Sequence, residues 1–275
     1  MTTWFTKTTA LASAFAAMAL MTGCATTTVS PEARSAYDKT QQSLKAQPVS
    51  IVSDACVLLV EMGQDDIMYQ HSNALSVAMA NTLKDSLNKQ GVTVNHLSSP
   101  FVCGAMTQKE LLEMDILATE DAKDVPNTDY PILSTNNAFD NVTNQAYLNL
   151  YKALVNVRKE SAESQKTGTN VPLNLDTASL NKIRQTENSD KVFVLLAAAN
   201  KQSFGLRFVA ASTSPLAGAL INRAPGSVYS IHLVNLKTNQ VQWNNSGLIT
   251  TEVFKSPVTG TVNTKDKILS PLYAE

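Results

Sequence analysis

The chain has 275 residues, of which 22 are Lys or Arg and 23 are Asp or Glu, so its formal net charge is −1. This balance excludes a global electrostatic argument for nucleic-acid binding. The length is enough for one large domain or two small ones, even after removal of an N-terminal signal.

The N-terminus has the pattern of a secretory signal peptide. Lys7 precedes an apolar run at residues 11–21, which is too short to span a bilayer comfortably, and small residues follow the run. The ending LMTGC resembles the bacterial lipobox, in which a diacylglyceryl thioether forms on the cysteine before cleavage. The resemblance implies a signal peptide at residues 1–23 and a lipidated mature N-terminus at Cys24.

Residue 25 is Ala rather than Asp, and this resembles the pattern of lipoproteins that are sorted to the outer membrane. We therefore expect the periplasmic face of the outer membrane as the location, with several acyl chains as a firm anchor. The alternatives are a plain signal peptide with an incidental cysteine, or a short buried helix.

Residues 24–50 are polar and lack an apolar stripe, so we expect a tether between the lipid and the body. Within it, the run Ser30-Pro31-Glu32 is typical of a helix start, which predicts a polar helix from residue 31 to about residue 46. Whether helical or flexible, this segment is expected to hold the body away from the membrane.

Residues 51–255 are predicted to form a periplasmic α/β domain. A nearly continuous apolar run at residues 55–62 predicts a strand that is buried on both faces. Ser72 is a candidate cap for the amphipathic helix that follows, and alternation at residues 92–97 predicts a second strand. The three elements together predict a βαβ-like unit.

Residues 107–187 are expected to be a helical insertion in this domain. It begins with a capping box at residues 107–110, and its longest helical pattern covers residues 142–165. Asp176 or Thr177 is expected to cap a further helix.

The second half of the domain is predicted to be mainly β. Residues 191–199 form another buried strand pattern, and residues 228–236 and 241–243 predict a hairpin. Asn239 can adopt the positive φ that its turn requires. The weak periodicity of residues 256–275 predicts a loosely ordered tail.

Together these patterns predict an α/β fold with a mixed sheet of about five strands, flanked by helices in two or three layers.

The three cysteines fit an oxidising compartment. If Cys24 carries the lipid, Cys56 and Cys103 remain as an even pair, and both lie close to predicted strands that should be neighbours. We expect either a disulfide between them or two small buried thiols. Neither has a CxxC partner or a nearby His, so no metal site is predicted.

Residues 200–227 combine Gly and Pro with apolar and basic side chains, and residues 191–251 contain no Asp or Glu. One interpretation is a flap that faces a partner or the membrane. Its candidate residues are Phe204, Arg207, Phe208, Leu216, Leu220 and Arg223. The simpler interpretation is a short strand and a helix packed on the sheet.

The hairpin sequence LVNLKTNQVQW at residues 233–243, together with the order of elements, resembles a group of bacterial envelope lipoproteins. Their three-layer domain is like the N-terminal domain of the Tol-system propeller protein, and the group includes the curli secretion lipoprotein. Asn239 stands where Gly is usual. The resemblance implies a non-catalytic α/β domain that binds another envelope protein or assembles with itself.

Catalytic motifs are absent from the sequence. His71 lies near Asp65 and Asp66, but no HxxxH or HExxH spacing, P-loop or G-x-S-x-G elbow occurs. The acids between residues 110 and 121 are explained by a solvated helix face.

These observations favour an outer-membrane lipoprotein that is a non-enzymatic binding or assembly module, without cofactor, for an envelope protein. The alternatives are a self-assembling component of a secretion complex, and a periplasmic ligand-binding protein or hydrolytic enzyme.

Overall fold

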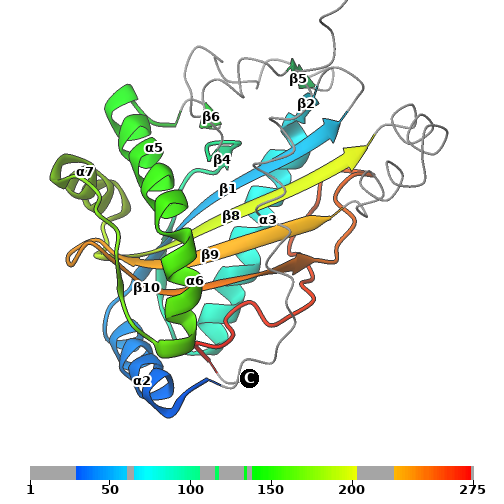
Figure 1. The fold of residues 1–275 in the computed structure, drawn as a ribbon. Helices are drawn as coiled ribbons and strands as arrows, with labels where there is room; N and C mark the ends of the chain where they lie inside the picture. The colour runs from blue at the N-terminus through cyan, green and yellow to red at the C-terminus, as the bar shows by residue number, and fades with distance from the viewer. Residues whose placement is uncertain are drawn as a thin grey trace, which may run out of the picture.

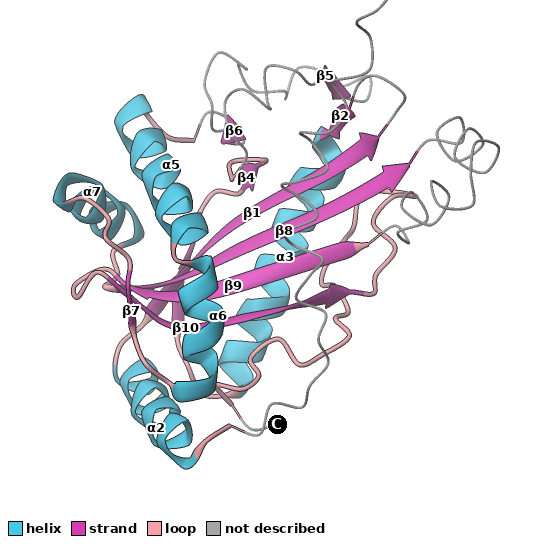
Figure 2. Cartoon of the chain, viewed as in Figure 1, coloured by secondary structure: helices cyan, strands magenta, loops and turns pink. Residues whose placement is uncertain are grey.

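In the computed structural model, a mixed β-sheet lies between two layers of helices (Figures 1 and 2). The structure describes residues 29–60, 65–105, 115–117, 133–134, 138–202 and 226–273. The α/β class expected from the sequence is confirmed.

The sheet is built around four long strands, and the other described strands have two to four residues each. The strands are β1 (Val49–Val60), β2 (Asp65–Met68), β3 (Val94–Leu97), β4 (Phe101–Val102), β5 (Asp115–Leu117), β6 (Leu133–Ser134), β7 (Val171–Pro172), β8 (Lys191–Gln202), β9 (Ser227–Asn235) and β10 (Gln240–Ile249). Their order is β5-β2-β1-β8-β9-β10-β7; β3 and β4 pair with β1, and β6 pairs with β4.

The centre of the sheet is the parallel pair β1 and β8, which runs from Ser50 opposite Val192 to Val60 opposite Gln202. The other side of β1 is shared by β3 and β4, which are parallel to it, and by β2, which is antiparallel. The parallel pairing of β1 with β3 across a helix confirms the predicted βαβ-like unit.

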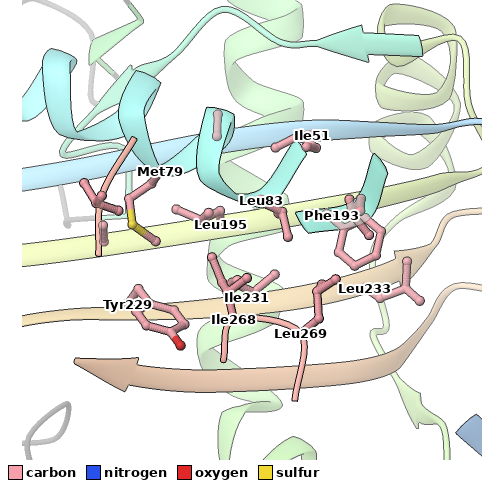
Figure 3. Packing of buried hydrophobic residues seen from close by; sticks show 14 of the residues in the cluster. Ile51, Met79, Leu83, Phe193, Leu195, Tyr229, Ile231, Leu233, Ile268 and Leu269 are labelled. Atoms are coloured by element: carbon pink, nitrogen blue, oxygen red, sulfur yellow. The ribbon is translucent and has the colours of Figure 1, made fainter. Parts of the chain in front are cut away.

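Five helices are described: α2 (Pro31–Ala46), α3 (Tyr69–Lys89), α5 (Asn141–Asn156), α6 (Arg158–Thr167) and α7 (Thr177–Glu187). On one face of the sheet, α2, α3 and the C-terminal residues enclose a core (Figure 3). On the other face, α5 and α7 enclose a second core. Successive residues of each strand point to opposite faces, so Phe193 and Leu195 enter the first core and Val192 and Val194 the second.

The single helix predicted for residues 142–165 is two helices, which meet at Val157. They pack against different partners, because α5 contacts α7 whereas α6 contacts α2 and β10. Asp176 caps α7 as expected, and its carboxylate accepts a hydrogen bond from the Ser179 backbone N–H at 2.8 Å.

The cap expected at Ser72 is wrong, because α3 begins at Tyr69 and Ser72 lies in its first turn. The Ser72 hydroxyl donates to the Met68 carbonyl and accepts from the Val57 N–H, both at 2.9 Å. Ser72 is therefore a buried link between α3 and β1 rather than a helix cap.

The helix predicted from residue 31 is confirmed as α2, but the expectation that it is a polar spacer is wrong. Ala33, Tyr37 and Leu44 lie on one side of α2 and are at most 1% exposed, because they pack into the core beside α3. Only three residues of the helix are buried, so the sequence shows no obvious apolar stripe. Residues 31–46 belong to the folded body.

The loosely ordered tail expected at residues 256–275 is also corrected, because the described part of it packs into the same core. Ile268, Leu269 and Leu272 are at most 5% exposed. This segment has weak periodicity because it is neither helix nor long strand, and its backbone pairs only briefly with β10 at Ile249 and Thr264.

The predicted hairpin is confirmed as β9 and β10, and Asn239 in its turn has φ of 55°. The Asn239 side chain also donates to the Leu175 carbonyl at 2.8 Å and accepts from the Leu175 N–H at 3.1 Å. Gly could form the turn but not these two bonds. Asn239 therefore connects the hairpin to the segment before α7.

The packed C-terminal segment makes a clear prediction about stability. Leu269→Ala should lower the free energy of unfolding by about 2–5 kcal/mol, because a fully buried leucine leaves a cavity. Thr261→Ala is the matched control in the same segment; Thr261 is exposed, so a change within about 0.5 kcal/mol is expected. Urea unfolding measures both, and equal effects of the two substitutions would contradict the packing.

Candidate functional site

Polar side chains are concentrated in the core under α5, and we call them the buried polar cluster. Its members are Asp54, Ser98, Tyr147, Tyr151 and Glu187, each at most 6% exposed. They come from β1, the segment after β3, α5 and the end of α7. A concentration of buried polar groups is where a site is expected, because each such group must be paired or serve a purpose.

Glu187 contacts side chains from two other elements of the fold. The Tyr147 hydroxyl donates to Glu187 Oε1, and His96 Nδ1 lies 3.0 Å from Glu187 Oε2. Glu187 is fully buried, whereas the His96 side chain is 42% exposed on β3. Burial, followed by the charge of Glu187, raises the pKa of Tyr147 far above its ordinary value.

Local structure places Glu187 in this position. Leu180, Ile183 and Glu187 lie three and four residues apart, so they share the face of α7 that packs toward α5. Asn188 then takes a left-handed conformation with φ of 49° and ends the helix. Sequence analysis missed this carboxylate, although an acid that continues an apolar helical stripe was a signal that could have identified it.

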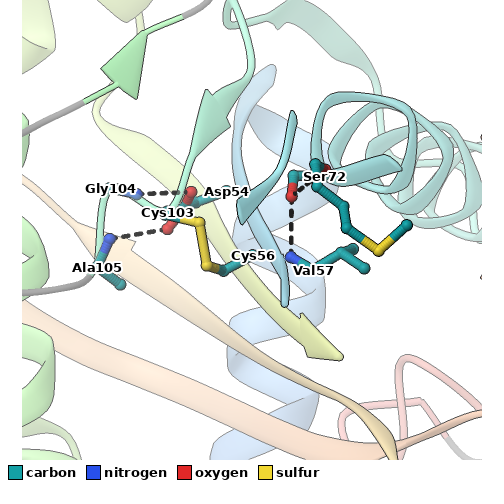
Figure 4. Close-up of a disulfide and its surroundings, with 8 residues drawn as sticks. Asp54, Cys56, Val57, Ser72, Cys103, Gly104 and Ala105 are labelled. Carbon is teal, nitrogen blue, oxygen red and sulfur yellow. Dashed lines mark hydrogen bonds between the residues drawn. A yellow bond between two sulfur atoms is a disulfide. The ribbon is translucent and has the colours of Figure 1, made fainter. Parts of the chain in front are cut away.

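Asp54 is the second buried carboxylate of the cluster, and it lies on β1 beside the disulfide (Figure 4). It accepts hydrogen bonds from the backbone N–H groups of Gly104 at 3.0 Å and Ala105 at 2.9 Å. Burial raises the pKa of Asp54 to about 6, and these two hydrogen bonds only partly oppose the increase.

Of the two alternatives for Cys56 and Cys103, the structure shows the disulfide, which connects β1 to the residues after β4. Cys103 has φ of 55°, and its N–H donates to the Ala55 carbonyl. The turn at Cys103 directs the next two N–H groups toward Asp54. Closing a loop of this length is expected to stabilise the fold by about 4 kcal/mol.

Tyr151 lies near both carboxylates, whose charges each act on its hydroxyl. Its hydroxyl has no hydrogen-bond partner among the described residues. Burial, followed by the charge of Asp54, raises its pKa well above the ordinary value. Tyr151 is therefore a neutral phenol in the buried polar cluster.

A half-exposed histidine that contacts a buried carboxylate is the arrangement of many general bases. Catalysis would also need a nucleophile or an oxyanion site within reach. The contacts that the structure shows around Glu187 are hydrogen bonds between elements of the fold. The arrangement supports a structural role, in which Glu187 connects β3, α5 and α7.

A second polar link holds the start of β8. Lys191 is 4% exposed, and its ammonium group donates to the Ser43 hydroxyl of α2. Burial lowers the pKa of Lys191. A shallow polar depression nearby includes Arg184 and Asp190, whose side chains form an ion pair at 2.6 Å. These charges neutralise each other, so they present no charged ligand site.

The remaining predicted residues are placed as follows. Cys24 lies outside the described residues, as do the flap residues Phe204, Arg207, Phe208, Leu216, Leu220 and Arg223. His71 is on α3, and burial followed by the charge of Lys201 lowers its pKa. Within the described ranges, no three His, Cys, Asp or Glu residues are grouped to hold a metal ion.

Comparison of the chain with protein-family models, with curated proteins and with solved structures finds no match.

The hydrogen bond between Tyr147 and Glu187 is testable with a matched pair of variants. Tyr147→Phe should lower the free energy of unfolding by about 1–3 kcal/mol, because it removes a donor from a buried carboxylate. Tyr151→Phe, one turn along the same helix, removes a hydroxyl without a partner in the described structure and should change stability by less than about 0.5 kcal/mol. Urea unfolding at neutral pH measures both, and similar losses would contradict the proposed role of Glu187.

Asp54 predicts a pH dependence of stability. Its pKa of about 6 in the folded protein lies above the value near 3.9 in unfolded chains, so the folded state binds the proton more tightly. Asp54 therefore contributes roughly 2–3 kcal/mol to the free energy of unfolding. This contribution is fully present below about pH 4 and is lost as the pH rises to about 6.

Asp54→Asn removes this titration. Between pH 4 and pH 6.5 the stability of the wild type should therefore fall relative to that of the variant, as measured by urea unfolding at several pH values. Parallel pH curves for the two proteins would show that Asp54 does not titrate in this range.

Proposed function

We propose that this chain is an outer-membrane lipoprotein, anchored through Cys24, whose periplasmic domain is a non-enzymatic binding or assembly module for another envelope protein. The observation that carries the proposal is that two of the three cysteines form a disulfide, which leaves the third for the lipid. Cys56 and Cys103 form a disulfide, which fits an oxidising compartment, and Cys24 ends a sequence that resembles a lipobox.

The chemistry of the buried polar groups supports binding rather than catalysis. Glu187 and Asp54 accept hydrogen bonds from groups that belong to other secondary-structure elements or to the loop after β4. Both carboxylates are thereby used to hold the fold together.

Among the described residues, no helix is both long and apolar enough to cross a bilayer.

The surface that we propose for the partner is the flap defined above, with its apolar and basic side chains. An apolar patch interleaved with cations suits either an acidic protein surface or an anionic membrane.

Self-assembly into a ring or secretion complex is the alternative in the same location. A self-assembling protein would form oligomers after the lipid is removed, whereas a binding module for another protein would be a monomer. Sedimentation of the delipidated protein measures this difference in mass.

The anchor is tested by Cys24→Ser in the native host. Loss of the thiol should abolish incorporation of labelled fatty acid and leave a precursor that keeps residues 1–23. Ala25→Asp is the matched control, because it keeps the lipidated cysteine and alters only the sorting position. This variant should still carry the lipid but move to the inner membrane. Unchanged fatty-acid labelling of Cys24→Ser would overturn the proposed anchor.

A further inference from the structure

The helix that follows the lipidation signal is fixed to the body, and this limits how the protein can sit on its membrane. Ala33, Tyr37 and Leu44 of α2 are buried in the core. The C-terminus of α6 also approaches α2 closely, because a Cβ on Gly168 would lie 2.8 Å from Ala33 Cα. Only glycine fits at this contact.

Hydrogen bonds add to this packing along the length of α2. They run from the Tyr37 hydroxyl to the Gln165 carbonyl, from Arg34 Nη1 to the Pro271 carbonyl at 3.3 Å, from Gln41 Nε2 to the Leu272 carbonyl at 2.6 Å, and from Lys191 to Ser43. The partners belong to α6, the C-terminal segment and β8. Helix α2 therefore cannot extend as a spacer without breaking contacts with three parts of the body.

Few residues separate the proposed lipidation site from α2. Val29 already packs against the core, and Ser30 caps α2 by accepting from the Ala33 N–H at 3.1 Å. Between Cys24 and Val29 there are only residues 25–28.

Five Cα–Cα steps reach at most about 18 Å when fully extended. A domain of this size is roughly 45 Å across, so the spacer is shorter than the radius of the body. The body cannot turn its opposite side to the membrane.

We infer that one defined end of the body faces the phospholipid headgroups of the membrane that carries the anchor. This end is formed by the first turn of α2, the C-terminus of α6 and residues 270–273, and we call it the anchored end. The inference rests on the proposed lipidation of Cys24. The sheet edge formed by β2 and β5 and the N-terminus of α5 lie on the side away from α2 (Figure 1).

Two exposed positions distinguish the ends of the molecule. Thr167 is the last residue of α6, beside α2, and Val142 is 68% exposed in the first turn of α5. The axes of α5 and α6 separate them by roughly 35 Å.

The experiment uses the full lipidated chain in vesicles of phosphatidylethanolamine and phosphatidylglycerol. Thr167→Cys and Val142→Cys are each labelled with a donor fluorophore, and a headgroup-labelled lipid is the acceptor. Energy transfer should be at least about twofold more efficient from position 167 than from position 142. Position 167 lies at the anchored end, whereas position 142 lies at the far end of α5 and α6.

A flexible Gly/Ser insert of about 20 residues after Thr28 is the matched control. It frees the body to rotate, so the ratio of the two efficiencies should fall toward one. Mass spectrometry of the same samples reports the lipid on Cys24. Absence of the lipid would refute the proposed anchor, whereas lipidated protein with equal transfer from both positions would overturn the inferred orientation.

Discussion

The parallel pairing of β1 with β8 is the contact on which the rest of the structure depends. The two strands are separated by more than half of the body's sequence, yet they lie side by side over almost their entire lengths. Helix α3, β3 and β4 attach to β1, and the β9–β10 hairpin attaches to β8. Both strands are covered on both faces, so any polar group on them must find its partner within the protein.

That constraint explains where the polar links occur. Asp54 points from β1 into a core without solvent, and the residues after β4 supply the two N–H groups that it needs. The disulfide at Cys56 holds the same residues in place from the next position on that face of β1. On the opposite face, Ser72 uses its hydroxyl to satisfy the Val57 N–H. Strand β1 is thus linked to its neighbours on both faces. Asp54 and the Val57 N–H are polar groups that must be hydrogen-bonded because they are buried.

The sequence was informative where local chemistry decides the structure. The hairpin follows from turn residues such as Asn239, and the start of α7 follows from the capping oxygen of Asp176. It was less informative where distant packing decides. The break at Val157 arises because α5 and α6 have different neighbours, and nothing within the helix itself encodes this.

The candidate site shows the same limit. The disulfide was predictable from cysteine counting, whereas the Glu187 contacts depend on α5, α7 and β3 meeting in space. Asp54 was missed for a different reason. The predicted strand began at residue 55, one position after it, so the aspartate was left outside the strand. With the strand bounds that the structure shows, Asp54 is a carboxylate within a buried strand. That pattern predicts a buried hydrogen-bond partner.

Docking of α2 also fixes the first described helix to the rest of the domain. Release of the helix would expose Tyr37 and Leu44, two fully buried side chains that together contribute roughly 3–6 kcal/mol. A free helix of this length is itself marginal in water, so release would also melt it. The released form is then populated at about 1% or less. The first and last described segments of the chain are therefore packed together at one end of the domain.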